Sequence, residues 1–176
     1  GQIASPPAPA PGEEPLPPTG FLQLMPAVEL IGRDDDAAEL HTRLTAADGP
    51  RGVTLVGIAG VGKTTLGYAV AHRVAAAYPG GVAGVVVTDG CSTGELLGGI
   101  AAGFGVGRTD DLAGRFAGRA ALLVVDAVER APEAVAEVLT HLLERLPSLR
   151  FLGTGRHPVG LAAERVWPLA PLVVPP

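Results

Sequence analysis

The stretch from Val56 to Leu66, VGIAGVGKTTL, limits what this chain can fold into more than any other segment. It places three glycines, the only lysine of the sequence and two threonines between a β-branched run, 52–56, and an alanine-rich run, 64–77. Gly57–Thr64 fit the pattern G-x-x-x-x-G-K-[ST], which has a physical meaning only between a strand and a helix. The two runs predict that strand and that helix. We therefore expect a phosphate-binding loop; a glycine-rich turn with a chance lysine is the alternative.

The residue types of this loop suit the phosphates of a nucleotide. Glycines let the backbone curl until its N–H groups face inward as a nest for an anion. The helix that follows adds the partial positive charge of its N-terminus at the same place. We expect Lys63 to reach the β- and γ-phosphates and the hydroxyl of Thr64 to ligate Mg²⁺.

Strand-like and helix-like segments alternate along the chain. Short apolar runs predict strands at 52–56, 82–87, 121–126 and 149–153, with a fifth over 165–169 at a sheet edge because of Pro168. We expect helices over 64–77, 92–104 and 109–119, and a further helix that begins at Pro132. Another helix is expected to begin at residues 34–36, where three aspartates would supply the N-cap and the negative charge of the first turn. This alternation predicts a parallel sheet with helices on both faces.

Composition narrows the class of protein and its organisation. Proline-rich residues 1–27 favour an extended linker, which implies a domain upstream; a disordered end with no attached partner is the alternative. We expect one domain over 28–172 and a tail over 173–176. The net charge of −5 argues against a broad nucleic-acid-binding face. Apolar runs are shorter than the ~18 residues of a membrane span. One cysteine and no signal-peptide pattern favour the cytoplasm.

Three charged residues follow predicted strands at the edge where α/β sheets bind ligands. Asp126 ends the third predicted strand and could hold Mg²⁺, or could cap the helix that follows. Glu129 could orient a water molecule, or be a solvated loop charge. Arg156 follows the fourth strand and could sense the γ-phosphate, or lie on the surface.

Four segments, taken in order, resemble the NB-ARC-like modules of bacterial STAND-type NTPases, found in antibiotic-pathway and LuxR-type transcriptional regulators. VELIGRD, from Val28, is similar to the segment at the start of those modules, and GIAGVGKTTL to their phosphate loop. ALLVVDAVER, from Ala121, is similar to their Walker B strand. LRFLGTGRHPVGLAAERVWPLAPL, from Leu149, is similar to the segment that carries their sensor arginine.

The resemblance implies a fold and a site. The fold is a three-layer α/β P-loop NTPase with a five-stranded parallel sheet in the order 5-1-4-3-2. The nucleotide is ATP or ADP with Mg²⁺, with Ile31 and Arg33 near the adenine and ribose. Thr64 and Asp126 would hold the metal, and Lys63, Asp126, Glu129 and Arg156 would act in catalysis. The phosphate-side contacts are Gly57, Ala59, Gly60, Val61, Gly62, Lys63, Thr64 and Thr65.

The resemblance also implies a function. The domain would be an ATP/ADP switch of a regulator, acting on transcription, with an upstream DNA-binding or activation domain and a downstream helical and winged-helix lid. A nucleotide-dependent homo-oligomer is a further expectation; direct nucleic-acid binding and membrane contact by this segment are not expected. The sequence departs from the family at three positions: Ala127 stands where the family has Asn or Asp, Gly155 where it has Ser, and His157 where it has Glu. Because Ala127 offers only a methyl group, we expect slow or absent hydrolysis. A constitutive ATPase or small-molecule kinase and a non-hydrolysing scaffold are the alternatives.

Overall fold

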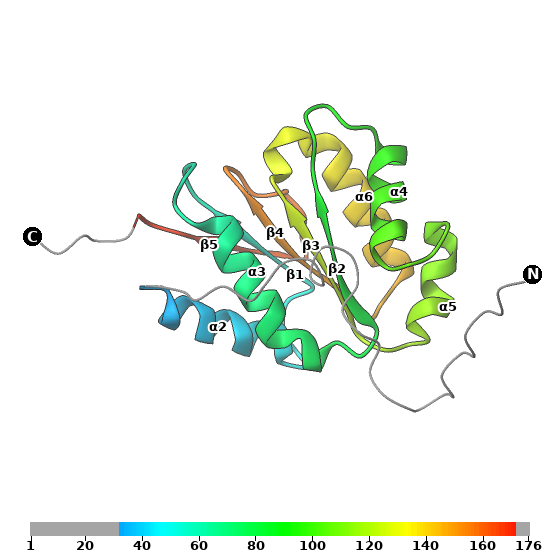
Figure 1. Ribbon diagram of the computed structural model, residues 1–176, viewed down its shortest axis with the longest axis horizontal. Helices are drawn as coiled ribbons and strands as arrows, with labels where there is room; N and C mark the ends of the chain where they lie inside the picture. The colour runs from blue at the N-terminus through cyan, green and yellow to red at the C-terminus, as the bar shows by residue number, and fades with distance from the viewer. Residues whose placement is uncertain (1–31, 172–176) are drawn as a thin grey trace, which may run out of the picture.

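The computed structural model describes residues 32–171, and its centre is a parallel sheet (Figure 1). The sheet order is β2-β3-β4-β1-β5, and each neighbouring pair of strands runs parallel. This is the predicted order 5-1-4-3-2 read from the other edge, so the predicted fold is confirmed. The strands are β1 Gly52–Val56, β2 Gly81–Val86, β3 Ala121–Asp126, β4 Leu149–Gly155 and β5 Glu164–Pro168.

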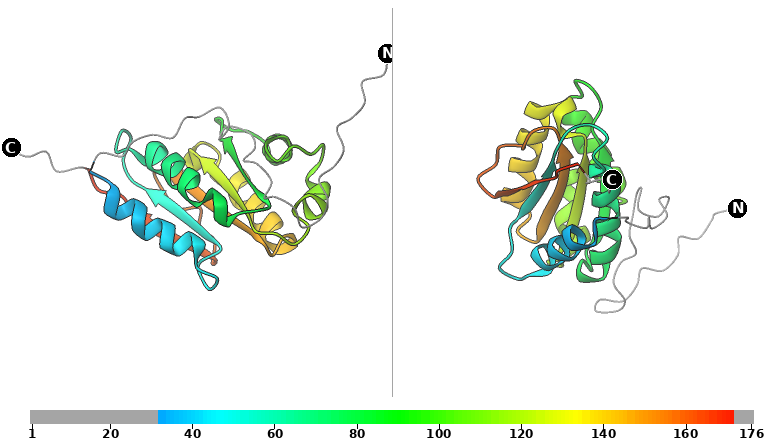
Figure 2. Two further views of the ribbon diagram at one scale, coloured as in Figure 1. Left: turned by 60° about the horizontal axis from the view of Figure 1, so that its bottom comes forward. Right: turned by 90° about the vertical axis from the view of Figure 1, so that its left-hand side faces the viewer.

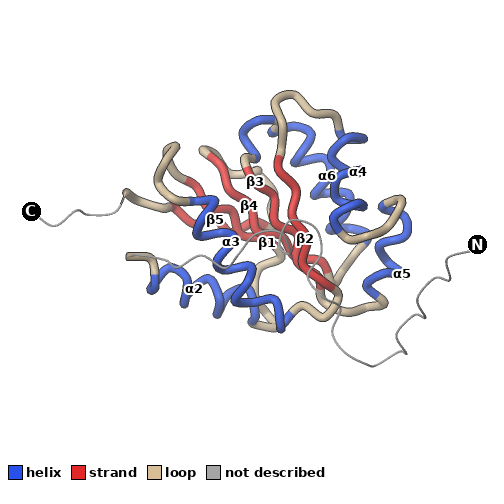
Figure 3. The backbone as a smooth tube through the Cα atoms, in the orientation of Figure 1, coloured by secondary structure: helices blue, strands red, loops and turns tan. Residues whose placement is uncertain are grey.

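Helices cover both faces of the sheet, and α3 and α6 lie on opposite sides of it (Figures 2 and 3). The α-helices are α2 Asp34–Thr45, α3 Lys63–Val74, α4 Thr93–Gly103, α5 Leu112–Phe116 and α6 Pro132–Arg145. Short 3₁₀ turns are η1 Ala75–Ala77, η2 Thr109–Asp111 and η3 Val128–Arg130. The predicted linker 1–27 and tail 173–176, like Ile31, lie outside the described residues.

Alternation along the strands explains the two layers of core. In β3, Leu122 and Val124 pack with α2 and α3, whereas Leu123 and Val125 pack with α4, α5 and α6. Successive side chains of a strand point to opposite faces, so a strand that is apolar throughout belongs in the middle of three layers. Helices therefore cover both faces of the sheet, and the carboxyl ends of its strands are left at one edge, where a site can form.

Local sequence signals mark the starts of two helices. Ser92 and Glu95 form the reciprocal capping box that begins α4, and Pro132 occupies the first turn of α6. One expectation is wrong: the N-cap of α2 is Arg33, without a side-chain cap, and the three aspartates lie in its first turn. The predicted helix over 109–119 is divided into η2 and α5. It also ends early, at Phe116, because Ala117 and Gly118 both have positive φ.

Candidate nucleotide-binding site

The carboxyl ends of β2, β3 and β4 and the loop from β1 to α3 line a cavity of about 460 Å³. Parallel strands bring their carboxyl ends to one edge, which explains why residues far apart in sequence meet there. Eight of the predicted site residues line it: Ala59, Gly60, Gly62, Lys63, Thr64, Thr65, Asp126 and Glu129. Of the other described candidates, Gly57, Val61, Arg33 and Arg156 lie outside that lining.

The loop has the backbone of an anion nest. Gly60 and Gly62 have φ of 81° and 98°, in the left-handed region that residues with a Cβ rarely adopt. Gly62 is the N-cap of α3, so the positive end of that helix faces the cavity. The Nζ of Lys63 donates to the carbonyl oxygens of Gly57 at 2.5 Å and Ile58 at 2.9 Å. The ammonium group of Lys63 therefore lies against the backbone of the loop itself.

Asp126 is the centre of a hydrogen-bonded group at the end of β3. Its Oδ1 accepts from the hydroxyl of Thr64 at 2.8 Å and from that of Thr154, at the end of β4, at 2.5 Å. The Thr154 hydroxyl in turn accepts from the N–H of Ala127 at 3.0 Å. Since the N-cap of α6 is Ala131, the helix-cap alternative for Asp126 is wrong. A carboxylate and a threonine hydroxyl in contact are oxygen ligands that suit Mg²⁺.

Tyr68 completes this group from α3. Its hydroxyl donates to Oδ2 of Asp126 at 3.3 Å. Burial raises the pKa of Tyr68 to about 12, and the charge of Asp126 and the hydrogen bond to it act in the same direction. The phenol therefore stays protonated at neutral pH and serves as a donor that orients the carboxylate.

Glu129 and Ala127 lie between β3 and α6, on the loop where the catalytic group was expected. Glu129 lines the cavity, and its Oε2 is a buried atom without a hydrogen-bond partner among the described residues. The side chain of Glu129 is therefore half-buried at the edge of the cavity. Ala127 adopts φ 66° and ψ 52°, a left-handed conformation. Gly155 lies against this loop, because a side-chain carbon there would collide with Val128 and come within 3.2 Å of Glu129 Oε2.

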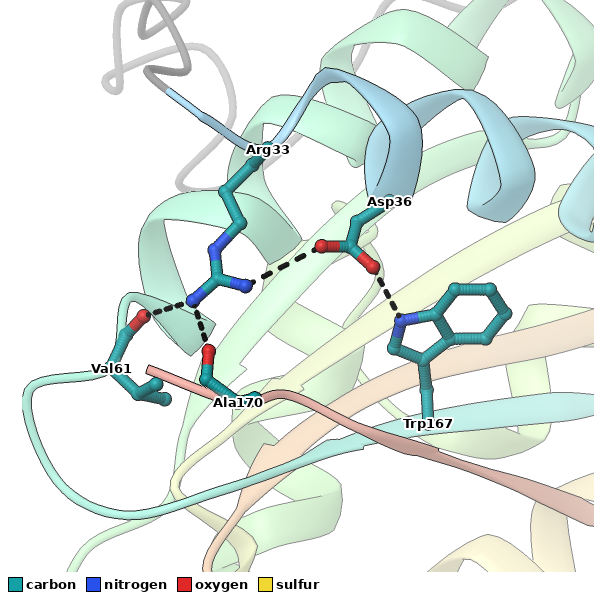
Figure 4. Close-up of polar contacts among 5 residues, drawn as sticks. All are labelled: Arg33, Asp36, Val61, Trp167 and Ala170. Carbon is teal, nitrogen blue, oxygen red and sulfur yellow. Dashed lines mark hydrogen bonds and ion pairs between the residues drawn. The ribbon is translucent and has the colours of Figure 1, made fainter. Parts of the chain in front are cut away.

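The two arginines predicted from sequence lie outside the cavity lining. Arg156 and Arg130 are both exposed, but only Arg130, on η3, lines the cavity. Arg33 is buried behind the loop, where its guanidinium donates to the carbonyl oxygens of Val61 and Ala170 (Figure 4).

Three residues of the site were missed by sequence reasoning: Tyr68, Thr154 and Arg130. The first left a signal, because Tyr68 follows Thr64 by four residues and so shares its face of α3. Thr154 left one too, because it directly follows the predicted strand 149–153, two residues before Arg156, at the edge where α/β sheets bind ligands. Arg130 left no such signal, because its position depends on the turn η3.

The fold and this site define a P-loop nucleotide-binding domain. Residues 52–161 match the family described as AAA domain (dynein-related subfamily), which is more than half of the chain. The chain belongs to that AAA family. Among the described helices, none is long and apolar enough to cross a membrane.

Bacterial relatives are proteins of Mycobacterium bovis and Mycobacterium tuberculosis named as HTH-type transcriptional regulators. They are 36% identical over 121 residues, which cover 65% of this chain. The chain spans only 14% of the length of these relatives.

Two solved structures share the fold. One is the STAND protein PH0952 of Pyrococcus horikoshii, which has a tetratricopeptide repeat sensor, with a TM-score of 0.52 and 17% identity over 91% of this chain and 25% of that one. The other is the Drosophila ORC bound to DNA, with a TM-score of 0.58 and 19% identity over 85% of this chain and 44% of that one.

Proposed function

We propose that this domain is an ATP/ADP-binding molecular switch of a STAND-type, NB-ARC-like regulator. The observation that carries the proposal is the joining of Thr64 to Asp126, 2.8 Å apart, beside the glycine nest of the loop. One side of this arrangement offers N–H groups and a lysine to phosphate oxygens. The other side offers the oxygen atoms that a hard divalent cation prefers.

The phosphates would be held by the loop amides and by Lys63. To reach them, the Nζ of Lys63 would exchange the carbonyl oxygens of Gly57 and Ile58 for phosphate oxygens. The hydroxyl of Thr64 and the carboxylate of Asp126 would hold Mg²⁺, which neutralises phosphate charge when bound. Thr154 and Tyr68 would keep the carboxylate in its orientation.

Hydrolysis would be slow, because the residue after the metal-binding acid is Ala127, which cannot take a proton from water. Glu129 is the remaining carboxylate of the cavity, and its buried Oε2 makes it the base on which residual turnover would depend. A positioned base contributes about 10²- to 10⁴-fold. A slow step suits a switch, whose lifetime in the ATP state is the signal.

The wider role is that of one domain in a longer regulator of transcription. The names of the mycobacterial relatives and the small share of their length that this chain spans support this role. We propose that residues 1–27 link the domain to an upstream DNA-binding or activation domain, and that a downstream helical lid closes on the nucleotide. The domain spans 28–172 in this proposal, acts in the cytoplasm and could form nucleotide-dependent homo-oligomers.

Steady-state phosphate release with Mg²⁺-ATP tests the switch proposal on three proteins: the parent chain, Ala127→Asp and Glu129→Gln. We expect slow release by the parent, faster release by Ala127→Asp and almost none by Glu129→Gln. Parent turnover above about 10 per second, the median for enzymes, would favour a constitutive ATPase instead. No release by the parent or Ala127→Asp, with nucleotide binding intact, would favour a scaffold that does not hydrolyse.

A further inference from the structure

Arg33 joins three segments of the chain that are distant in sequence. It is 9% exposed, and one guanidinium nitrogen donates to the carbonyl oxygen of Val61, in the phosphate loop, at 3.1 Å and to that of Ala170 at 2.6 Å (Figure 4). Its other terminal nitrogen pairs with Asp36 at 3.4 Å. A buried charge bound to main-chain oxygens of two segments restrains both of them.

The group extends to the only tryptophan of the chain. Asp36 accepts a hydrogen bond from the indole N–H of Trp167, on β5, at 3.3 Å (Figure 4). Arg43 of α2 stacks over the Trp167 ring, 5.4 Å from its centroid. Three consecutive polar contacts therefore connect the indole to the phosphate loop, through Asp36 and Arg33.

Peptide geometry gives the contact with Val61 a consequence for phosphate binding. A trans peptide is planar, so the carbonyl of Val61 and the N–H of Gly62 point in opposite directions. Arg33 holds that carbonyl on the side away from the cavity, and Gly62 lines the cavity. The hydrogen bond thereby fixes an N–H of the nest without touching the ligand.

The chain after β5 also packs directly on the start of the loop. The N–H of Leu169 donates to the carbonyl of Val56 at 2.7 Å. A side-chain carbon at Gly57 would lie 2.8 Å from the carbonyl oxygen of Leu169, so glycine is required for this approach. A rearrangement of the loop would therefore be felt at Leu169 and Ala170.

We propose that Arg33 is a positioning residue, which holds the phosphate loop in its anion-binding shape and couples the loop to the segment that leaves β5. This rests on the proposed nucleotide binding and goes beyond it. This role differs from a contact with adenine, because it acts through the main-chain oxygens and the carboxylate that the guanidinium binds in the structure. In a switch, it would carry the state of the phosphates to the residues that follow Ala170.

Binding of inorganic pyrophosphate, which has no base, separates the two roles. Calorimetric titration with Mg²⁺-ADP and with Mg²⁺-pyrophosphate is made on the parent, Arg33→Met and Arg43→Gln. We expect Arg33→Met to weaken both ligands by a similar factor, about tenfold or more, as for the loss of a charge-assisted contact. Arg43→Gln removes a charge from the same helix without loop contact and should keep the parent affinity. If Arg33→Met weakened ADP but not pyrophosphate, Arg33 would contact the adenine base, and the proposal would be overturned.

The fluorescence of Trp167 tests the coupling. Pyrophosphate should change the emission of the parent, and the change should disappear in Arg33→Met at saturating ligand. Asp36→Asn, a milder variant for use if Arg33→Met does not fold, should weaken both ligands by one common, smaller factor. An unchanged parent emission at saturation would overturn the coupling, and unchanged affinities in the variants would overturn the positioning role. A parent that binds neither ligand would overturn the proposed nucleotide binding as well.

Discussion

At the scale of single residues, Ala127 carries backbone strain at the edge of the cavity. A residue with a Cβ in the left-handed region costs roughly 1–2 kcal/mol relative to its ordinary conformation, and glycine avoids most of this cost. We expect Ala127→Gly to raise the free energy of unfolding by about 0.5–1 kcal/mol, after the larger entropy of an unfolded glycine is subtracted. Urea-induced unfolding at neutral pH measures it.

The matched control for that substitution is Ala38→Gly, at an exposed position inside α2. There the alanine is unstrained, so the same chemical change should lower the free energy of unfolding by about 1 kcal/mol. Destabilisation of similar size at both positions would mean that Ala127 is not strained.

Tyr68 makes the stability of the protein depend on pH in the alkaline range. Its pKa is raised to about 12 in the folded protein, against 10.0 for a free tyrosine. The stabilisation is complete below pH 10 and is lost as the pH rises through 12, because only the unfolded chain releases the proton readily between these values. We expect the free energy of unfolding of the parent to fall more steeply from pH 10 to pH 12 than that of Tyr68→Phe. Parallel curves would show that the phenol is not held protonated.

At the scale of elements, an arginine before β1 ties down the end of α6. Arg51 donates to the carbonyl oxygens of Leu143 and Leu146, at the carboxyl end of α6, and to that of Leu149, at the start of β4. The last carbonyls of a helix have no partner within the helix, and they carry its partial negative charge. This one side chain thus connects the end of α6 to the starts of β1 and β4.

We expect Arg51→Met to lower the free energy of unfolding by about 1–3 kcal/mol, because it keeps the apolar stem but removes the hydrogen bonds from the guanidinium to these carbonyls. Arg145→Met is the control, since Arg145 is in the last turn of the same helix but exposed. Its cost should be within about 0.5 kcal/mol. Equal losses in a urea titration would show that charge at the helix end matters and that the hydrogen bonds do not.

The elements and the loop were predictable because their signals are local. Apolar runs gave the strands, and the spacing of Gly57–Thr64 placed the loop between a strand and a helix. The end of β4, two residues beyond the expected 149–153, depends on pairing with β1 and not on propensity. Contacts between segments distant in sequence were not predictable: Arg33 and Ala170 are 137 residues apart, and no periodicity links them.

At the scale of the whole molecule, the sheet order decides which polar residues meet. With β1 beside β4 and β4 beside β3, the loop after β1, Thr154 and Asp126 come to one edge. The same order puts β5 next to β1, so Leu169 and Ala170, directly after β5, lie beside the phosphate loop. This neighbourhood is the physical basis of the proposed coupling between phosphate binding and the residues after β5.

The central claim is that the loop binds the phosphates of a nucleotide, and Lys63 tests it most directly. Calorimetric titration with Mg²⁺-ADP is made on the parent, Lys63→Ala and, as a control for lost charge, Arg108→Ala, which is exposed and far from the loop in sequence. A charge-assisted contact is worth about 1.5–3 kcal/mol. We predict that Lys63→Ala binds ADP at least about tenfold more weakly, while Arg108→Ala binds it as the parent does. Equal affinity of Lys63→Ala and the parent would contradict the account.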